Sequence, residues 1–123
     1  MTSHTMVRYE LPFPPSVNNL FVTVGSKRVR STRYKAWAKE AGQFILLQGR
    51  KRVRGPVSLS VALVRPDRRT RDLSNTLKAI EDLLVDMSVI DDDSLIHRLS
   101  VQWVSSGAPC VVLIQEAVEE MAA

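Results

Sequence analysis

The chain has 123 residues, of which 45% are hydrophobic, and its formal net charge is +4. This length fits a single domain over residues 1–123, because domains commonly run about 100–150 residues. No apolar run approaches the roughly 20 residues of a membrane-spanning helix, and the N-terminus lacks the hydrophobic stretch of a secretory signal; we therefore expect a cytoplasmic protein with no membrane partner.

The first half of the chain alternates between strand and loop signals. A short strand is predicted over residues 7–11, and the three prolines that follow end it because proline cannot donate to a strand ladder. A hairpin turning at Gly25 comes next. From Ser31 to near Gly49, apolar residues recur at helical spacing and predict an amphipathic helix. Three basic residues lie at or just after the hairpin turn: Lys27, Arg28 and Arg30.

The second half begins with a basic loop and an alternating strand over residues 57–64. A second amphipathic helix is predicted from Leu73 to about Asp86, and two further strands over 95–104 and 110–115. Because strands and helices do not alternate regularly, we expect an α+β fold with two layers. It consists of a mixed β-sheet of about five strands with two helices packed on one face.

Charge is divided unequally along the chain. Residues 11–71 contain 14 of the 17 Lys and Arg residues but only two acids, whereas residues 72–123 contain ten of the 13 acids. Such polarisation within one domain favours an anionic ligand at the first half, and nucleic acid is the commonest such ligand. A solvated basic surface without a ligand is the alternative.

Asp72 stands between an arginine-rich segment, "RPDRRTR", and the second helix. Its ordinary role at that position would be a helix cap, and Ser74 could serve as the cap instead. The other acid cluster near a loop is the triplet of residues 91–93, which in isolation reads as a solvated turn. If the triplet and Asp72 converge, their repulsion favours a hard divalent cation such as Mg²⁺. The second helix carries the chain away from Asp72, and the few residues after it can barely span the way back. A partner subunit could therefore supply one of the two acid groups.

The cations next to these acids fit the same hypothesis. Arg68, Arg69 and Arg71 would hold the phosphates that the acids alone would repel. Lys78 lies on the polar face of the second helix, where it could stabilise charge developing on a leaving oxygen. The alternative for Lys78 is an ordinary i,i+4 pair with Asp82.

Other chemistries find little support in the sequence. No phosphate-binding loop of the G-x-x-x-x-G-K-[ST] type, Cys/His zinc spacing or nucleophile elbow is present. The single cysteine, Cys110, lies in a strand-like apolar run and is expected to be buried.

Three segments together resemble the RusA family of Holliday junction resolvases, which are common in phages and prophages. They are "LPFPPSVNN", "RPDRRTRDLSNTLKAIEDLL" and "VIDDDSLI", and the resemblance covers nearly the whole chain. It implies a small homodimer that binds four-way DNA junctions and cuts two symmetry-related strands with Mg²⁺. The family pattern is close to R-D-L-D-N-x-x-K, followed after a helix by D-D.

By position, the resemblance assigns the first family aspartate to Asp72 and the family asparagine and lysine to Asn75 and Lys78. The acidic pair falls on Asp92 and Asp93, with Asp93 as the essential member. Together with the charge pattern, this predicts catalysis by Asp72, Asp93 and Lys78 and a metal held by Asp72, Asp92 and Asp93. It also predicts DNA contacts from Asn75, from the arginines of the loop and from the hairpin.

Ser74 departs from the family pattern, because the second aspartate of D-L-D-N stands there in the family. A hydroxyl can hold a metal-bound water but adds no charge, so weaker Mg²⁺ affinity is expected unless Asp91 or Asp92 substitutes. The leading hypothesis is a homodimeric, metal-dependent endonuclease for branched DNA, with Mn²⁺ as a possible cofactor. A junction-binding protein without cleavage and a nucleotide phosphohydrolase remain alternatives.

Overall fold

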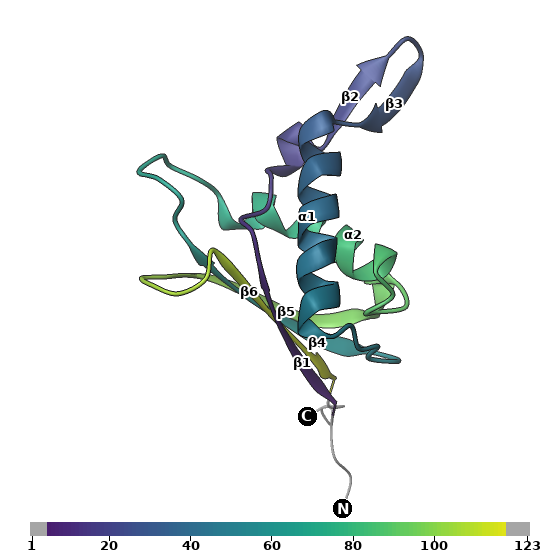
Figure 1. The fold of residues 1–123 in the computed structure, drawn as a ribbon, viewed down its shortest axis with the longest axis vertical. Helices are drawn as coiled ribbons and strands as arrows, with labels where there is room; N and C mark the ends of the chain where they lie inside the picture. Colours follow the sequence, from purple (N-terminus) through teal and green to yellow (C-terminus); the bar gives the residue numbers. More distant parts are fainter. Residues whose placement is uncertain (1–4, 118–123) are drawn as a thin grey trace, which may run out of the picture.

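The computed structural model describes residues 5–117 (Figure 1). Strands β1, β6, β4 and β5 form one sheet in that order, in which β4 and β5 are the parallel pair. The other two pairs, β1 with β6 and β4 with β6, are antiparallel. In chain order the elements are β1 (Met6–Leu11), β2 (Phe21–Val24), β3 (Lys27–Arg30), α1 (Thr32–Gln48), β4 (Val57–Val64), α2 (Leu77–Asp86), β5 (Ile96–Val104) and β6 (Cys110–Glu116).

Both helices pack on the same face of this sheet. Alternate residues of the central strand β4, from Val57 to Leu63, are buried in one core with Ile45 of α1 and Ile80 of α2. The β4 residues between them point to the opposite face and are only partly buried. Alternation of this kind is expected for a strand with one face on the core. The predicted α+β two-layer fold is therefore confirmed.

The strand count differs from the prediction in one respect. The hairpin of β2 and β3 does not join the sheet; it forms a separate two-stranded sheet that projects beyond the N-terminal end of α1 (Figure 1). An isolated two-stranded hairpin is marginally stable, and here side-chain contacts tie it to the helices. Phe21 meets Tyr34 of α1 edge to face at 5.9 Å between ring centroids, and Arg30 pairs with Asp86 of α2 at 3.0 Å.

The start of α1 also fixes the loop that leads into the hairpin. Ser31 caps the helix by accepting a hydrogen bond from the Tyr34 amide at 3.0 Å, and its hydroxyl donates to the Asn19 carbonyl at 2.6 Å. Trp37, three residues after Tyr34, donates from its indole nitrogen to the Pro12 carbonyl at 3.0 Å. Residues 12–19 are thus held against α1 at both ends.

Two other expectations are tested by the fold. Cys110 is fully buried in the core, as predicted for a cysteine in an apolar strand, and burial raises the pKa of its thiol to about 12. Neither helix within residues 5–117 combines the length and the hydropathy needed to cross a membrane.

Candidate active site

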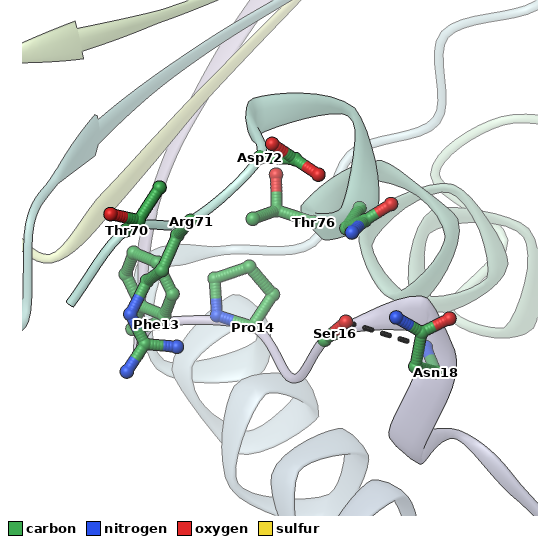
Figure 2. Close-up of a pocket in the computed structure, with 9 residues that line it drawn as sticks. Phe13, Pro14, Ser16, Asn18, Thr70, Arg71, Asp72 and Thr76 are labelled. Carbon is green, nitrogen blue, oxygen red and sulfur yellow. Dashed lines mark hydrogen bonds between the residues drawn. The ribbon is translucent and has the colours of Figure 1, made fainter.

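A pocket of about 300 Å³ lies between two loops that are far apart in the sequence (Figure 2). One loop follows β1 and contains the Pro-Pro-Ser segment, and the other carries the chain from β4 into α2. Proline keeps the first loop out of the sheet, because it cannot continue the β1 ladder. The residues that line the pocket are Phe13, Pro14, Ser16, Asn18, Thr70, Arg71, Asp72, Asn75 and Thr76.

The Asp72 side chain does not cap a helix. Asp72 precedes a 3₁₀ turn, Leu73–Thr76, and its side chain makes no capping hydrogen bond; only its backbone carbonyl accepts, from the Asn75 amide at 3.2 Å. α2 starts after this turn, with Thr76 at its N-cap position. The predicted first turn of the helix is therefore a 3₁₀ turn, and the cap interpretation of Asp72 and of Ser74 is wrong.

The carboxylate of Asp72 is consequently available for a ligand. Within residues 5–117 the structure records no hydrogen bond or ion pair to its oxygens, and the residue is exposed at the pocket. Asn75, assigned by the resemblance as a DNA contact, lines the same pocket. An unpaired carboxylate, an amide and hydroxyl groups are the hard oxygen donors that Mg²⁺ prefers.

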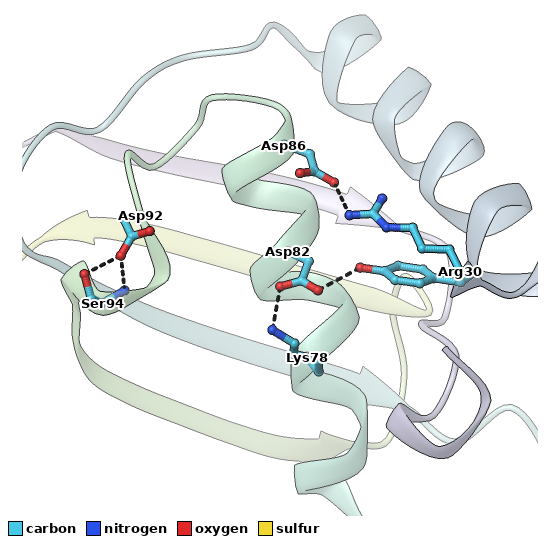
Figure 3. Close-up of polar contacts among 7 residues, drawn as sticks. Arg30, Lys78, Asp82, Asp86, Asp92 and Ser94 are labelled. Carbon is cyan, nitrogen blue, oxygen red and sulfur yellow. Dashed lines mark hydrogen bonds and ion pairs between the residues drawn. The ribbon is translucent and has the colours of Figure 1, made fainter. Parts of the chain in front are cut away.

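The aspartate triplet divides into three different environments. Asp91 is engaged by the Arg52 guanidinium, whose Nε lies 2.7 Å from Oδ1. Asp92 caps a second 3₁₀ turn, Asp93–Leu95, by accepting from the hydroxyl and from the amide of Ser94 (Figure 3). Both hydrogen bonds lower the pKa of Asp92, and the bond from the Ser94 hydroxyl has the larger effect. Two of the three acids therefore already have local structural roles.

Asp93 is the member of the triplet whose charge influences ionisable side chains of α2. Lys78 and Glu81 lie on neighbouring turns of that helix, and the charge of Asp93 contributes to the raised pKa of each. The larger cause is the hydrogen bond to Asp82 for Lys78 and burial for Glu81. The structure thus brings the predicted lysine and Asp93 within electrostatic reach of each other.

Lys78 is held in place by a short polar chain (Figure 3). Its ammonium nitrogen lies 2.9 Å from Oδ1 of Asp82, and the Tyr34 hydroxyl donates to Oδ2 of the same carboxylate at 3.0 Å. The i,i+4 pair considered as the alternative is therefore confirmed as a contact. It also fixes the position and the positive charge of the lysine, which a catalytic role requires.

The predicted meeting of Asp72 with the triplet is not complete within one chain. None of residues 91–93 lines the pocket, and residues 5–117 contain no group of three or more Asp, Glu, His or Cys side chains that could hold a metal ion. A ligand set of Asp72, Asp92 and Asp93 stays a prediction.

Asp67 organises the arginine-rich loop, a role that sequence reasoning missed. Its carboxylate accepts from the Arg71 guanidinium at 2.8 and 3.3 Å and from the Arg69 amide at 3.0 Å, and the Arg71 bond lowers the pKa of Asp67. The available signal was the i,i+4 spacing of Asp67 and Arg71. Arg71 lines the pocket, whereas Arg68 and Arg69 are exposed beside it.

The hairpin cations fall into two groups. Arg30 ties the hairpin to the body through Asp86 and lies over the Tyr34 ring, with its Cζ 4.8 Å from the ring centroid. Lys27 and Arg28 are exposed towards the hairpin tip, and Arg28 lies over Phe21. Of the three predicted DNA contacts, Arg30 therefore has a clear structural function as well.

Ser16 and Asn18 are pocket residues that the sequence reasoning did not select. The Ser16 hydroxyl accepts from the Asn18 amide at 3.3 Å, which shapes the short 3₁₀ turn after the prolines (Figure 2). Both belong to the "PPSVNN" segment, and that motif is the one signal by which the sequence could have indicated them. Nothing in the local sequence predicts that this segment lies opposite Asp72.

Comparison with known proteins gives one family and two relatives. Residues 12–115 match the family model described as endodeoxyribonuclease RusA. A crossover junction endodeoxyribonuclease RusA of Aquifex aeolicus is 28% identical over 110 residues, covering 85% of this chain and 83% of the relative. A crossover junction endodeoxyribonuclease of Enterobacteria phage HK97 is 32% identical over 99 residues, covering 76% of this chain and 79% of the relative.

Proposed function

This chain belongs to the RusA family of endodeoxyribonucleases, and from that premise we propose that it is a metal-dependent, homodimeric endonuclease that resolves four-way DNA junctions. The observation that carries the proposal is the Asp72 carboxylate, which lies unpaired in a pocket next to Arg71. An acid beside a cation repels phosphate less than an acid alone. With a divalent ion, the pair suits binding and hydrolysis of a phosphodiester.

The donor chemistry fits Mg²⁺ or Mn²⁺. Mg²⁺ commonly uses one or two carboxylates and completes its coordination with water and phosphate oxygens. Asp72 and Asp93 would hold the ion, with Asp92 as a further ligand. When bound, the ion supplies an activated water and neutralises charge on the phosphate. Because residues 5–117 of one chain contain no group of three or more Asp, Glu, His or Cys side chains that could hold a metal ion, we propose that dimer formation completes the ligand set.

Lys78 of α2 and Asn75 of the 3₁₀ turn before it assist the chemistry in this proposal. Lys78, oriented by Asp82, would stabilise negative charge that develops on the leaving oxygen. Asn75, at the pocket wall, would hold the strand by hydrogen bonds from its amide. Neither role requires the side chain to change its protonation state.

The basic surface would follow the DNA backbone on either side of the pocket. Arg68, Arg69 and Arg71 come from one loop, and Lys27, Arg28 and Arg30 from the hairpin that projects beyond α1 (Figure 1). Contacts to phosphates give affinity without sequence readout, which suits a protein that recognises the shape of a branch point.

A two-fold dimer matches a substrate with two-fold symmetry, because each subunit can then present one pocket to one of two equivalent strands. The similarity to a phage protein supports the further proposal that the protein works on DNA in the cytoplasm of a bacterial host.

The direct test is cleavage of a labelled synthetic four-way junction over a series of Mg²⁺ and Mn²⁺ concentrations. We expect Asp72→Asn and Asp93→Asn to abolish cutting but to retain or strengthen junction binding, since each removes negative charge near phosphate. Glu10→Gln, on the face of the sheet away from the helices, is the control and should cut normally. Normal cutting by Asp72→Asn would overturn the proposal.

A junction-binding protein without cleavage is the second candidate, and Ser74 is the observation that favours it. The exposed Ser74 takes the position of a family aspartate and adds no charge to the site. Tight junction binding without nicking at any concentration of either metal would decide for this candidate.

A further inference from the structure

Four side chains from three segments of the chain, the loop after β1, the loop from β4 to α2, and β5, form a continuous stack beside the pocket. Phe13 and Trp103 lie parallel, with their ring centroids 6.2 Å apart and an interplanar angle of 6°. The Arg65 guanidinium carbon lies 4.4 Å from the centroid of Trp103, and that of Arg71 lies 5.7 Å from the centroid of Phe13. The order of the stack is Arg65, Trp103, Phe13 and Arg71.

The order of the stack indicates that the two rings support the arginines. A guanidinium lies over each of the two aromatic rings, while the rings face each other, so the stack presents cations at its ends. Aromatic rings that read DNA by stacking need a free face for a base. Here the rings instead support the arginines, whose planar guanidinium groups stack well on aromatic faces.

The two arginines differ in how they are otherwise held. Arg71 is also oriented by Asp67, at 2.8 Å. Within residues 5–117, no ion pair is recorded for Arg65, which is exposed, so the Trp103 ring is its observed support. Trp103 itself is placed by the sheet, because β5 pairs with β4 and sets Trp103 opposite Leu63, two residues before Arg65.

We propose that Arg65 and Arg71 form a preorganised two-point clamp for the phosphates of one DNA strand, and that Phe13 and Trp103 are positioning residues for this clamp. The proposal rests on the proposed DNA-binding function and adds Arg65, Phe13 and Trp103 to it. Preorganisation matters because an arginine that is already fixed loses less side-chain freedom on binding. The clamp lies at the pocket that contains Asp72 and would hold the strand there.

The test measures how the junction affinity of the full-length protein depends on KCl concentration, by fluorescence anisotropy. Each phosphate contact contributes about 0.9 to the slope of log affinity against log salt. Arg65→Gln should weaken binding several-fold and reduce the slope by about one unit. The matched control is Arg8→Gln on the opposite face of the sheet, which should leave the slope unchanged.

Variants of the tryptophan separate positioning from general stability. Trp103→Leu should reduce the slope as Arg65→Gln does, and Trp103→Phe, which keeps a ring, should restore most of it. The double variant Arg65→Gln/Trp103→Leu should bind no more weakly than Arg65→Gln alone, because the ring acts through that arginine. Circular dichroism checks that the variants are folded.

The clamp is overturned if Arg65→Gln leaves the slope unchanged, or if Trp103→Leu and Arg65→Gln weaken binding additively. If Trp103→Leu does not fold, the salt dependence of Arg65→Gln alone decides the proposal, because Arg65 is exposed and its substitution should not disturb the fold. The proposed function fails separately, if wild-type protein neither prefers a junction to linear duplex nor cuts it. In that case the same slopes measured on linear duplex still test the clamp.

Discussion

Asp82 connects Lys78 to Tyr34: one carboxylate oxygen lies 2.9 Å from the lysine nitrogen, and the other accepts from the tyrosine hydroxyl at 3.0 Å. This contact raises the pKa of Lys78. A group whose pKa is raised on folding stays protonated to higher pH, and its favourable charge is lost as the pH rises through that value. The contact with Asp82 therefore favours the charged form of the lysine.

Asp82→Asn is expected to move the alkaline limb of the cleavage rate to lower pH, because Lys78 loses the anion that stabilises its charged form. Single-turnover rates at saturating metal, measured across the alkaline range, give the two profiles. Glu10→Gln, on the face of the sheet away from the helices, is the control. Identical alkaline limbs for the wild type and Asp82→Asn would show that Asp82 does not control the charge of Lys78 during cleavage.

Ser74→Asp is expected to lower the metal concentration at which cleavage is half-maximal. The substitution restores a charged oxygen at the family position, two residues after Asp72, and a further carboxylate raises the affinity for a hard cation. The measurement is cleavage over a Mg²⁺ series, with binding of Mn²⁺ alone followed by calorimetry. Ser100→Asp, which also adds one aspartate but lies on the face of the sheet away from the helices, controls for added charge; equal effects of the two changes would count against a special role for position 74.

Asp67→Asn should separate the two functions of the arginine loop. It releases Arg71 from its partner at 2.8 Å and removes a negative charge, so affinity for DNA should rise at low salt. Cleavage should fall, because Arg71 is no longer directed at the pocket. Anisotropy and single-turnover cleavage on the same junction measure both. A parallel rise of affinity and cleavage would show that the orientation of Arg71 is unimportant.

Ser31→Ala tests the coupling of α1 to the Pro-Pro-Ser loop. It removes the helix cap at Tyr34 and the bond to the Asn19 carbonyl, and loss of an N-cap alone costs about 1 kcal/mol in the free energy of unfolding. Urea unfolding should therefore show a loss of about 1–2 kcal/mol. Thr32→Ala, at the next position, should change the unfolding free energy little, and an equal loss would argue against the cap.

Much of the fold could be predicted from local pattern. Residues 57–64 alternate strictly and form β4 with those bounds, and the helical spacing after Ser31 ends at Gly49, as in the structure. The hairpin around Gly25 was also predicted, but not its separation from the sheet. Strand signals show that a segment pairs with something; they do not say with which partner, since pairing is a long-range contact.

For the site, the sequence by itself determined the chemistry: a carboxylate at Asp72 among arginines, a lysine six residues later at Lys78, and a second acid group at residues 91–93. Only the tertiary structure decided the roles. It showed that Asp72 caps nothing, that Asp91 is taken by Arg52, and that residues 12–19 form the opposite wall of the pocket. The physical reason is that hydrogen-bond partners and pocket walls come from segments tens of residues apart, whose approach is set by packing of the common core rather than by any local periodicity.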